Sequence, residues 1–536
     1  MSHKYLPVPM PDKKITFKTG KNGTQYAYYT VRAYRNKNGK PTSDEVAIGK
    51  KDPITGQLIP NRRYFDIFHD ASPVLESKVV ADRVQSVGTT TALLELANKA
   101  GLVKILEERF PAKWNKLLAC AFYMICEGNV MMYIEDWFDE TRVDFTSRMN
   151  DAECSRLFAS ITYEERVAFF RSWVSYRGER EYIVYDVSSV STYSGNIDIA
   201  EWGYNRDGEK LPQINLGMYY GATSHMPVYY NLYSGSIPDK TYLKFMMTSA
   251  RDLGITDVCF VMDRGFVTKD NFQFVKEKGY TFVTAMPLHQ PSARKLIDEN
   301  GNEVRTSSNH IAQSNTFGLK LEASLYGMEL HAHIYYDTAK QVADENDLFS
   351  RINKLREELK KMRKPKTVAK KYKTYFTVST NEDGALSFEM KNDEVDALLK
   401  RTGFFILLSS KADLCSAEVL RIYREKDALE KNFDSFKNEL DFRRMRTHYT
   451  RTMEGKMFVG FLALILRSYM QRIVKKDPLT KRLSIDKILI ELRKIRSVTH
   501  SDLSKSLIPL TKQQRTILSV LDVPLQSLTD EQNGIL

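Results

Sequence analysis

The order of the apolar segments between residues 181 and 287 constrains the fold more than any other feature of the chain. Short apolar runs rich in β-branched and aromatic residues predict strands, and apolar residues at 3.6-residue spacing predict helices. In chain order these are the strands EYIVYDVSSVS (181–191), QINLGMYYGAT (213–223) and MPVYYNLYSG (226–235), a helix over 241–254, the strand DVCFVMD (257–263), a helix over 267–279 and the strand YTFVTAMP (280–287). The order β-β-β-α-β-α-β predicts a mixed sheet with helices on its faces.

This is the order of elements in a ribonuclease-H-like α/β fold. In this chain a long segment interrupts the sheet. Residues 288–400 contain the strand-like runs LKLEASLY, MELHAHIYYD and YKTYFTVST, so we expect a β-rich insertion. The insertion also carries a highly charged helix, with ten Lys or Arg and two acids between Lys354 and Lys373. A buried strand, GFFILLSS (403–410), then returns the chain to the sheet.

Charge and hydropathy narrow the class of partner. Lys and Arg number 79 against 67 Asp and Glu, a net charge of +12, which favours nucleic acid first and a membrane surface second. The longest apolar runs, LLACAFYMIC and MFVGFLALIL, have ten residues each, too few to span a bilayer. The start of the chain has no apolar signal segment, and the five cysteines lack CxxC spacing. We therefore expect a cytoplasmic protein with reduced cysteines and no membrane partner.

Two acids follow apolar residues of the predicted sheet. Asp186 and Asp263 each close an apolar strand, at the end where α/β sheets usually build their sites. If the first and fourth strands are neighbours, the two carboxylates meet and must share a proton or hold a cation, and Mg²⁺ prefers such oxygen ligands. The alternative is an ordinary helix cap or turn acid, which is the commoner role of one Asp considered alone.

A charged helix, VLRIYREKDALEKNFDSFKNEL (419–440), carries a third acid. On a regular helix four side chains share an arc of about 60°: Tyr423, Lys426, Glu430 and Lys437. Asp427 lies near the same arc and is the rival third acid. The alternative is a solvated helix face stabilised by pairs four residues apart.

Together these residues resemble the DDE transposases of bacterial insertion sequences. The resemblance is to the branch with a β-rich insertion between the second and third acids and the signature Tyr-x2-Arg/Lys-x3-Glu-x6-Lys. Here the signature reads YREKDALEKNFDSFK, with Lys426 in place of the commoner Arg. The 167 residues from Asp263 to Glu430 fit only the long-insertion branch. The stretch GYNRDGEKLPQINLGMYYG also resembles the family, and the resemblance covers roughly residues 85–475.

The resemblance implies a mechanism and its ligands. Asp186, Asp263 and Glu430 would be the catalytic acids and would hold two Mg²⁺ ions, for which Mn²⁺ would substitute. The enzyme would bind the terminal inverted repeats of an insertion sequence, cleave them with water and join the freed 3′-hydroxyls to target DNA. A homodimer would hold the two double-stranded ends, in the nucleoid of a bacterial cytoplasm.

DNA contacts are expected from residues beside the acids. Cationic and hydroxyl side chains bind phosphates, and the candidates are Tyr423, Lys426, Lys437, Arg264, Arg443 and Arg444. The basic stretch of the insertion is equally well a DNA contact or a solvated helix.

The length of 536 residues exceeds what one core spans, so we expect several domains or subdomains. The predicted parts are a small antiparallel β unit with a candidate DNA-contacting face (1–80), a helical subdomain that is a candidate for DNA-end binding (81–180), the first part of the ribonuclease-H-like core (181–287), the insertion (288–400), the second part of the core with the catalytic helix (401–475) and a C-terminal helical region (476–536).

Three other functions compete with transposition. A nuclease without strand transfer would use the same acids, and a transposase-derived DNA-binding protein would have an inactive site. A membrane-surface protein is the least favoured, because no basic amphipathic helix with aromatic anchors stands out.

Overall fold

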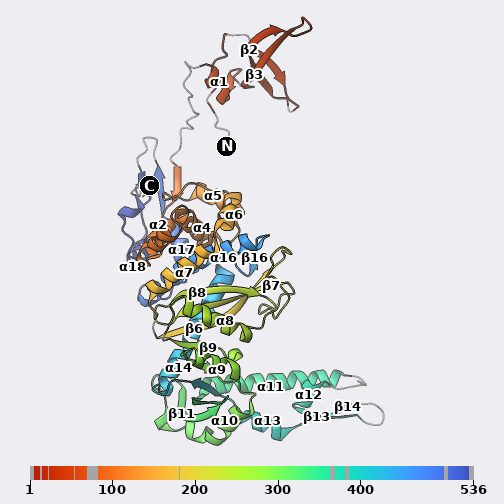
Figure 1. The fold of residues 1–536 in the computed structure, drawn as a ribbon, viewed down its shortest axis with the longest axis vertical. Coiled ribbons are helices and arrows are strands. Elements are labelled where there is room, and N and C mark those ends of the chain that lie inside the picture. Colours follow the sequence, from red (N-terminus) through yellow and green to blue (C-terminus); the bar gives the residue numbers. More distant parts are fainter. Residues whose placement is uncertain are drawn as a thin grey trace. The chain divides into compact units, whose positions relative to one another are not determined.

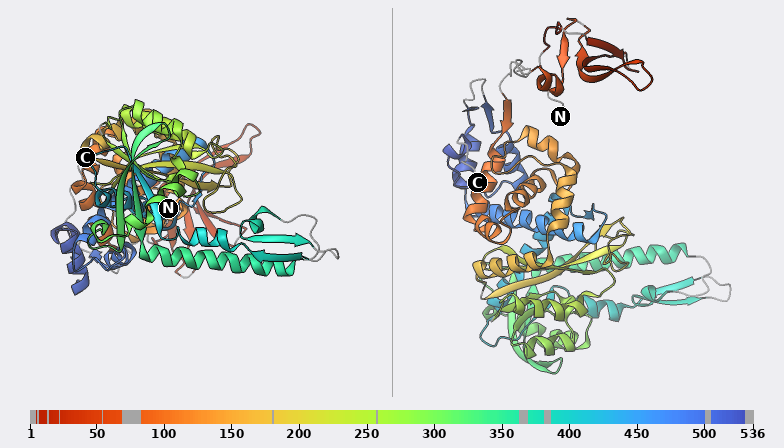
Figure 2. Two further views of the ribbon diagram at one scale, coloured as in Figure 1. Left: turned by 90° about the horizontal axis from the view of Figure 1, so that it is seen from below. Right: turned by 45° about the horizontal axis from the view of Figure 1, so that its top comes forward.

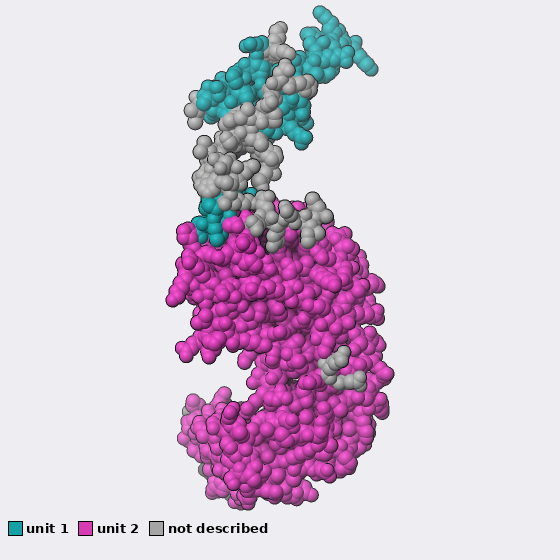
Figure 3. All heavy atoms as spheres, turned by 90° about the vertical axis from the view of Figure 1, so that its left-hand side faces the viewer, with its two compact units in different colours: residues 1–84, 497–508 teal, residues 85–496, 509–536 magenta. Residues whose placement is uncertain are grey.

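The computed structural model describes residues 5–68 (apart from 6, 13–14, 22 and 54), 83–362 (apart from 180 and 257), 369–380, 386–499 and 505–529. The chain divides into two compact units, distinguished by colour in Figure 3. One unit consists of residues 1–84 and 497–508, and the other consists of residues 85–496 and 509–536.

The first unit contains the small β structure that the sequence predicts ahead of the core. Its antiparallel sheet has the order β1 (Ile15–Thr19), β2 (Gln25–Arg35), β3 (Pro41–Lys51) and β4 (Leu58–Pro60). Helix α1 (Arg62–Ile67) follows, and its Tyr64 packs with Ala27, Ile48 and Leu58 in a small core. A second sheet has the order β18 (Lys505–Leu507), β17 (Arg496–Thr499) and β5 (Arg83–Ser86).

Helices form the beginning of the second unit. They are α2 (Gly88–Lys99), α3 (Leu102–Arg109), α4 (Trp114–Glu127), η1 (Met131–Tyr133), α5 (Ile134–Glu140), α6 (Asp151–Ser160) and α7 (Tyr163–Arg177). Helices α6 and α7 begin at capping boxes, in which Asn150 and Thr162 accept hydrogen bonds from the backbone three residues ahead. The Trp173 indole N–H of α7 donates to Pro227 O at 2.9 Å, which fastens this block to the sheet.

The large sheet confirms the predicted fold class. Its strand order is β11-β12-β15-β10-β9-β6-β7-β8, with the short β16 also paired to β6. The strands are β6 (Tyr182–Thr192), β7 (Gln213–Gly221), β8 (Met226–Ser234), β9 (Cys259–Met262), β10 (Thr281–Ala285), β11 (Thr316–Leu325), β12 (Met328–Asp337), β15 (Phe404–Ser409) and β16 (Arg444–Met445). β6, β9 and β10 are parallel, whereas β7 and β8 continue the sheet antiparallel beside β6. This is the ribonuclease-H-like order of strands, with α8 (Asp239–Asp252) and α9 (Lys269–Glu277) as its crossover helices.

The insertion both widens this sheet and forms an arm. Strands β11 and β12 extend the sheet beyond β15. The remaining elements are α10 (Pro291–Val304), η3 (Ser307–Asn309), α11 (Thr338–Lys361), α12 (Lys370–Lys373), β13 (Phe376–Thr380), β14 (Leu386–Met390) and α13 (Asn392–Leu399). Helix α11 and the β13–β14 hairpin protrude side by side in Figures 1 and 2, around a core that includes Ile352, Leu359 and Phe376. Part of the predicted basic stretch, residues 363–368, lies outside the described residues.

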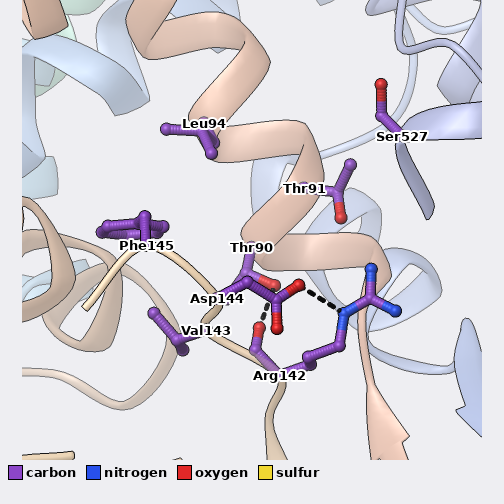
Figure 4. A pocket seen from close by; sticks show the side chains of 8 residues that line it. All are labelled: Thr90, Thr91, Leu94, Arg142, Val143, Asp144, Phe145 and Ser527. Atoms are coloured by element: carbon purple, nitrogen blue, oxygen red, sulfur yellow. Dashed lines mark hydrogen bonds and ion pairs between the residues drawn. The ribbon is translucent and has the colours of Figure 1, made fainter. Parts of the chain in front are cut away.

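The C-terminal region docks on the helices of the second unit. It contains α17 (Ile485–Arg493), α18 (Lys512–Val520) and η5 (Gln526–Leu528). The buried Arg142 guanidinium donates to Leu528 O at 2.9 Å and pairs with Asp144 at 2.9 Å. The Thr90 hydroxyl donates to the carbonyl of Arg142, as Figure 4 shows. These bonds fix the last described turn of the chain against α2.

Helix α16 (Thr450–Lys476) forms the centre of the second unit. By length and composition it could cross a membrane, but 78% of its apolar window is buried inside the protein. It packs against α4, α6 and β8. The close approach to α6 requires Gly455, because a Cβ there would lie 2.0 Å from Phe158 O. Its burial identifies α16 as a core helix.

The buried Lys456 of α16 predicts a pH-dependent stability. Its ammonium lies 3.3 Å from Asn129 Oδ1 and 3.4 Å from Arg446 O, without a carboxylate, and burial lowers its pKa to about 7. The unfolded chain keeps the ordinary value of 10.5, so it binds an extra proton between these pH values and stability rises with pH. We expect Lys456→Met to raise the free energy of unfolding by about 2–4 kcal/mol at pH 7 and by much less at pH 10.

Urea unfolding at the two pH values measures this difference. Lys476→Met, at the exposed end of the same helix, is the control and should change stability little at either pH. An equal effect of Lys456→Met at pH 7 and pH 10 would show that the buried ammonium is not the cause.

Candidate active site

The pairing of β6 with β9 brings the first two acids together. The parallel register places Tyr185 opposite Met262, so Asp186 and Asp263, one residue further, occupy neighbouring strands at the same level. The condition set by the sequence, that these two strands be neighbours, is therefore met. Asp263 lies where β9 ends and η2 (Arg264–Phe266) begins.

Asp186 does not close its strand, contrary to the sequence-based expectation. β6 continues to Thr192, because Val187 to Ser191 pair with β7 after β9 has ended. Asp186 thus marks the end of the parallel pairing, and the polar run SSVS that follows belongs to the strand, as the predicted range 181–191 has it. Those serines stay buried through pairing on the β7 side.

The helix predicted over residues 419–440 is divided into three elements. They are α14 (Ser416–Arg424), α15 (Lys426–Asp434) and the π-helix η4 (Ser435–Glu439). Leu440 N donates to Ser435 O, an i→i+5 bond that turns the following residues away from the regular helical spacing. Lys437 lies within this π-turn, so the regular spacing of about 100° per residue assumed for it does not hold, and its ammonium pairs with Asp207 instead of with the three acids.

The Lys426 ammonium is the point at which the three predicted acids converge. It lies 3.7 Å from Asp186 Oδ2, 3.7 Å from Asp263 Oδ1 and 2.5 Å from Glu430 Oε1. Since all three oxygens lie this close to one nitrogen, no two of them are separated by more than twice the longest of these distances. The chain thus gathers carboxylates from two strands and a helix around a single positive charge.

Burial makes this charge arrangement strong. The side chains of Lys426 and Asp186 are 10% and 14% exposed, while that of Glu430 is 56% exposed. Burial raises the pKa of Asp186, and the Lys426 charge opposes that shift. Burial alone would lower the pKa of Lys426, but Asp186, Glu430 and Asp263 raise it above its ordinary value. Burial also raises the pKa of Tyr423 to about 12, so its hydroxyl remains a donor at neutral pH.

This donor set fits a divalent cation. The ammonium is a stand-in ion: it shows that the three carboxylates can surround one positive charge, and Mg²⁺ takes oxygen ligands of this kind. Within the described part of the chain, no three His, Cys, Asp or Glu side chains are already grouped closely enough to hold a metal by themselves. Binding of a metal at these acids would therefore require the ammonium to move.

The other signature lysine is held by an acid outside the signature. Lys437 is buried, and its ammonium pairs with Asp207 at 2.7 Å. In the same loop between β6 and β7, Glu209 pairs with Arg444 at 2.9 Å, and Arg206 pairs with Asp239 at the start of α8. Arg206 and Asp207 lie within the stretch GYNRDGEKLPQINLGMYYG that resembles the family. Glu209 and Asp239 were not singled out from the sequence. The available signal for Glu209 was its place within the family-like stretch, and that for Asp239 was its place at a helix start.

The remaining candidates lie at different places around the site. Arg264 and Arg443 are exposed, the first directly after Asp263 and the second between η4 and β16. Arg444 also lies over the Tyr193 ring at 5.3 Å. Asp427, the rival third acid, lines a cavity with Arg424, Lys431 and residues of α16 instead of joining Lys426.

A second cavity, of about 360 Å³, adjoins Asp186 and Asp263. Its lining includes Arg206, Asn215 and Asp239. The buried Asn215 amide donates to three backbone carbonyls of residues 234–237, which holds this wall in place. The acids therefore open onto a space that a substrate group can enter.

A family model supports the resemblance to DDE transposases, whereas the insertion-sequence branch and its signature stay predictions. No curated protein sequence matches the chain. A solved structure of the piggyBac transposase in a synaptic complex with hairpin DNA is similar at 8% identity and a TM-score of 0.35, covering 80% of this chain and 73% of that one. The model of the transposase DDE domain matches residues 177–466, which contain Asp186, Asp263 and Glu430. Because this match spans more than half of the 536 residues, the chain belongs to the transposase DDE domain family.

Proposed function

We propose that this protein is a transposase that cleaves the ends of an insertion sequence and joins the freed 3′-hydroxyl groups to target DNA. The observation that carries the proposal is the convergence of Asp186, Asp263 and Glu430 on the Lys426 ammonium. Membership of the transposase DDE domain family supports phosphodiester chemistry at these acids. The net charge of +12 suits a double-stranded DNA partner.

Asp186, Asp263 and Glu430 would together hold two Mg²⁺ ions. Such ions activate a water or hydroxyl nucleophile and neutralise charge that develops at the phosphorus. Asp186 is the most buried of the three acids. Mn²⁺ would substitute for Mg²⁺, since both accept carboxylate oxygens.

The chain's own cations and hydroxyls would bind the DNA strand. Lys426 would donate to a phosphate oxygen of the DNA strand beside Glu430. Tyr423 donates its hydroxyl to the same strand, because its raised pKa keeps the proton in place. Lys437 and Arg444 already bind Asp207 and Glu209, and DNA phosphates compete with these carboxylates for them.

The assembly in which this happens would be a homodimer that holds two terminal inverted repeats, acting in the nucleoid of a bacterial cytoplasm. Arg264 and Arg443, both exposed near the acids, are proposed contacts to the same DNA.

An assay that supplies paired ends and a target plasmid tests the whole reaction. Joined products support transposition, whereas cleavage without joining would reduce the proposal to a nuclease.

Substitution of the third acid tests its role. We expect Glu430→Gln to lower metal-dependent DNA cleavage by at least a thousandfold, because the amide cannot supply the negative oxygen that a metal needs. DNA binding should fall less than threefold, since 56% of the Glu430 side chain is exposed and the fold does not depend on it. Cleavage and electrophoretic mobility assays on the same DNA measure the two effects.

Asp427→Asn is the matched control, because it removes the neighbouring acid on another face of the same helix. It should retain cleavage within a few-fold of the wild type. Normal cleavage by Glu430→Gln together with loss by Asp427→Asn would assign the third ligand to Asp427.

Removal of the central ammonium tests the stand-in role of Lys426. Without metal, we expect Lys426→Met to lower the free energy of unfolding by about 1–3 kcal/mol, because the carboxylates lose their countercharge. Metal would then bind without displacing a charge, so the affinity for Mn²⁺ should rise at least tenfold. Thermal unfolding and calorimetric titration with Mn²⁺ measure these changes without relying on activity.

Lys431→Met serves as the control, because it removes an exposed lysine of the same helix that does not contact the acids. Unchanged Mn²⁺ affinity in Lys426→Met would show that the ammonium and the metal do not use the same oxygens.

A further inference from the structure

A basic cavity of about 410 Å³ lies on the side of α14 and α15 away from the acids. It is enclosed by the α14–α15 junction, the C-terminal half of α16 and the turn between β7 and β8. Five of the lining residues are cations: Arg424, Lys431, Arg472, Lys475 and Lys476. None of the transposition chemistry described above uses these residues.

The helix spacing explains why the two sites face apart. Arg424 and Lys431 are seven residues apart and therefore lie on one face of the helix. Lys426 and Glu430 follow Arg424 by two and six residues, which places them roughly opposite. The same helical segment thus presents a carboxylate-rich face to Asp186 and a cationic face to this cavity.

The second wall of the cavity is equally regular. Arg472, Lys475 and Lys476 are spaced by three and four residues, so α16 aligns them on one face. The floor joins the two helices, because the Ser468 hydroxyl donates to Asn432 Oδ1 at 2.6 Å. Two fixed rows of positive charge therefore face a common space.

The cations that line this space outnumber the acids that line it. Asp427 is the one acid in the lining, and in the described part of the chain no ion pair involves any of the five cations. Glu425 lies 3.6 Å from His225, which also lines the cavity. Arg472 donates to the Ser224 carbonyl and Lys475 to the Lys481 carbonyl, which orients both without neutralising them. Such an arrangement attracts an anion with several negative charges.

We propose that this cavity binds the phosphate backbone of a DNA segment other than the one cut at Asp186. The inference rests on the proposed transposase function, which requires the protein to hold more than one DNA segment. Arg and Lys are the usual phosphate contacts, and Arg424, Lys431, Lys475 and Lys476 are exposed enough to reach a surface polymer. Because a helix with its side chains is about 10 Å thick, one phosphate cannot contact both faces of α15.

The test compares the full-length double variant Lys431→Gln/Lys475→Gln with the wild type. Binding to a long mixed-sequence DNA duplex is measured by fluorescence anisotropy over a series of salt concentrations. Loss of two phosphate contacts should weaken binding about tenfold at low salt and reduce the slope of log affinity against log salt by about 1.8. Metal-dependent cleavage of a short duplex should persist, because neither residue contacts the acids.

The control double variant Lys276→Gln/Lys295→Gln makes the same change in net charge at exposed lysines elsewhere and should leave the slope within experimental error. Thermal unfolding verifies that both double variants are folded. An equal change of slope in the control would overturn the proposal, because net charge alone would then explain it.

Pyrophosphate separates a DNA site from a site for a free anion. Calorimetric titration measures pyrophosphate binding to the wild type and to Lys431→Gln/Lys475→Gln. If the double variant loses pyrophosphate binding but keeps the wild-type slope of log DNA affinity against log salt, the proposal is overturned. Failure of the wild type to cleave DNA with metal would refute the proposed function. If the wild type and Lys431→Gln/Lys475→Gln still differed in the salt dependence of DNA binding, that difference would support the basic cavity as a DNA contact even then.

Discussion

The attraction between one buried ammonium and three carboxylates is the interaction on which the functional part of this structure depends. Asp186 and Asp263 are adjacent because β6 and β9 are parallel and in register, and Glu430 reaches them from α15. Like charges this close repel unless a cation lies among them, and here Lys426 supplies it. A lysine four residues before Glu430 thus stabilises a site for which we propose metal-dependent chemistry.

The same principle extends outward from the site. Lys437 is buried against Asp207, and the exposed Arg444 pairs with Glu209, so the loop between β6 and β7 neutralises two cations that were predicted to contact DNA. These pairs hold the loop and the π-turn in position without DNA. The contrast with the basic cavity behind α15 is clear, because its cations have no such partners among the described residues. Charge balance therefore distinguishes two faces of one helical segment.

The sheet was predictable, because its strands are short apolar runs separated by turn residues. Parallel pairing of two such strands then places the two acids at the same level. The signature spacing likewise identified Glu430 over Asp427, although its role as a metal ligand stays a prediction. The π-turn was not predictable, since regular helical spacing assumes unbroken i→i+4 bonds. The strand was predicted over 181–191, but Asp186 was wrongly placed at its end, because the polar residues after it pair only with a strand that lies later in the chain. Long-range ion pairs such as Lys437 with Asp207 leave no local pattern at all.

Anomalous diffraction from crystals grown with Mn²⁺ tests the central claim most directly. The account expects anomalous peaks bounded by carboxylate oxygens of Asp186, Asp263 and Glu430, with the Lys426 ammonium moved out of their centre. Peaks held by Asp427, or the absence of any peak while Lys426 still bridges the three acids at saturating Mn²⁺, would contradict it.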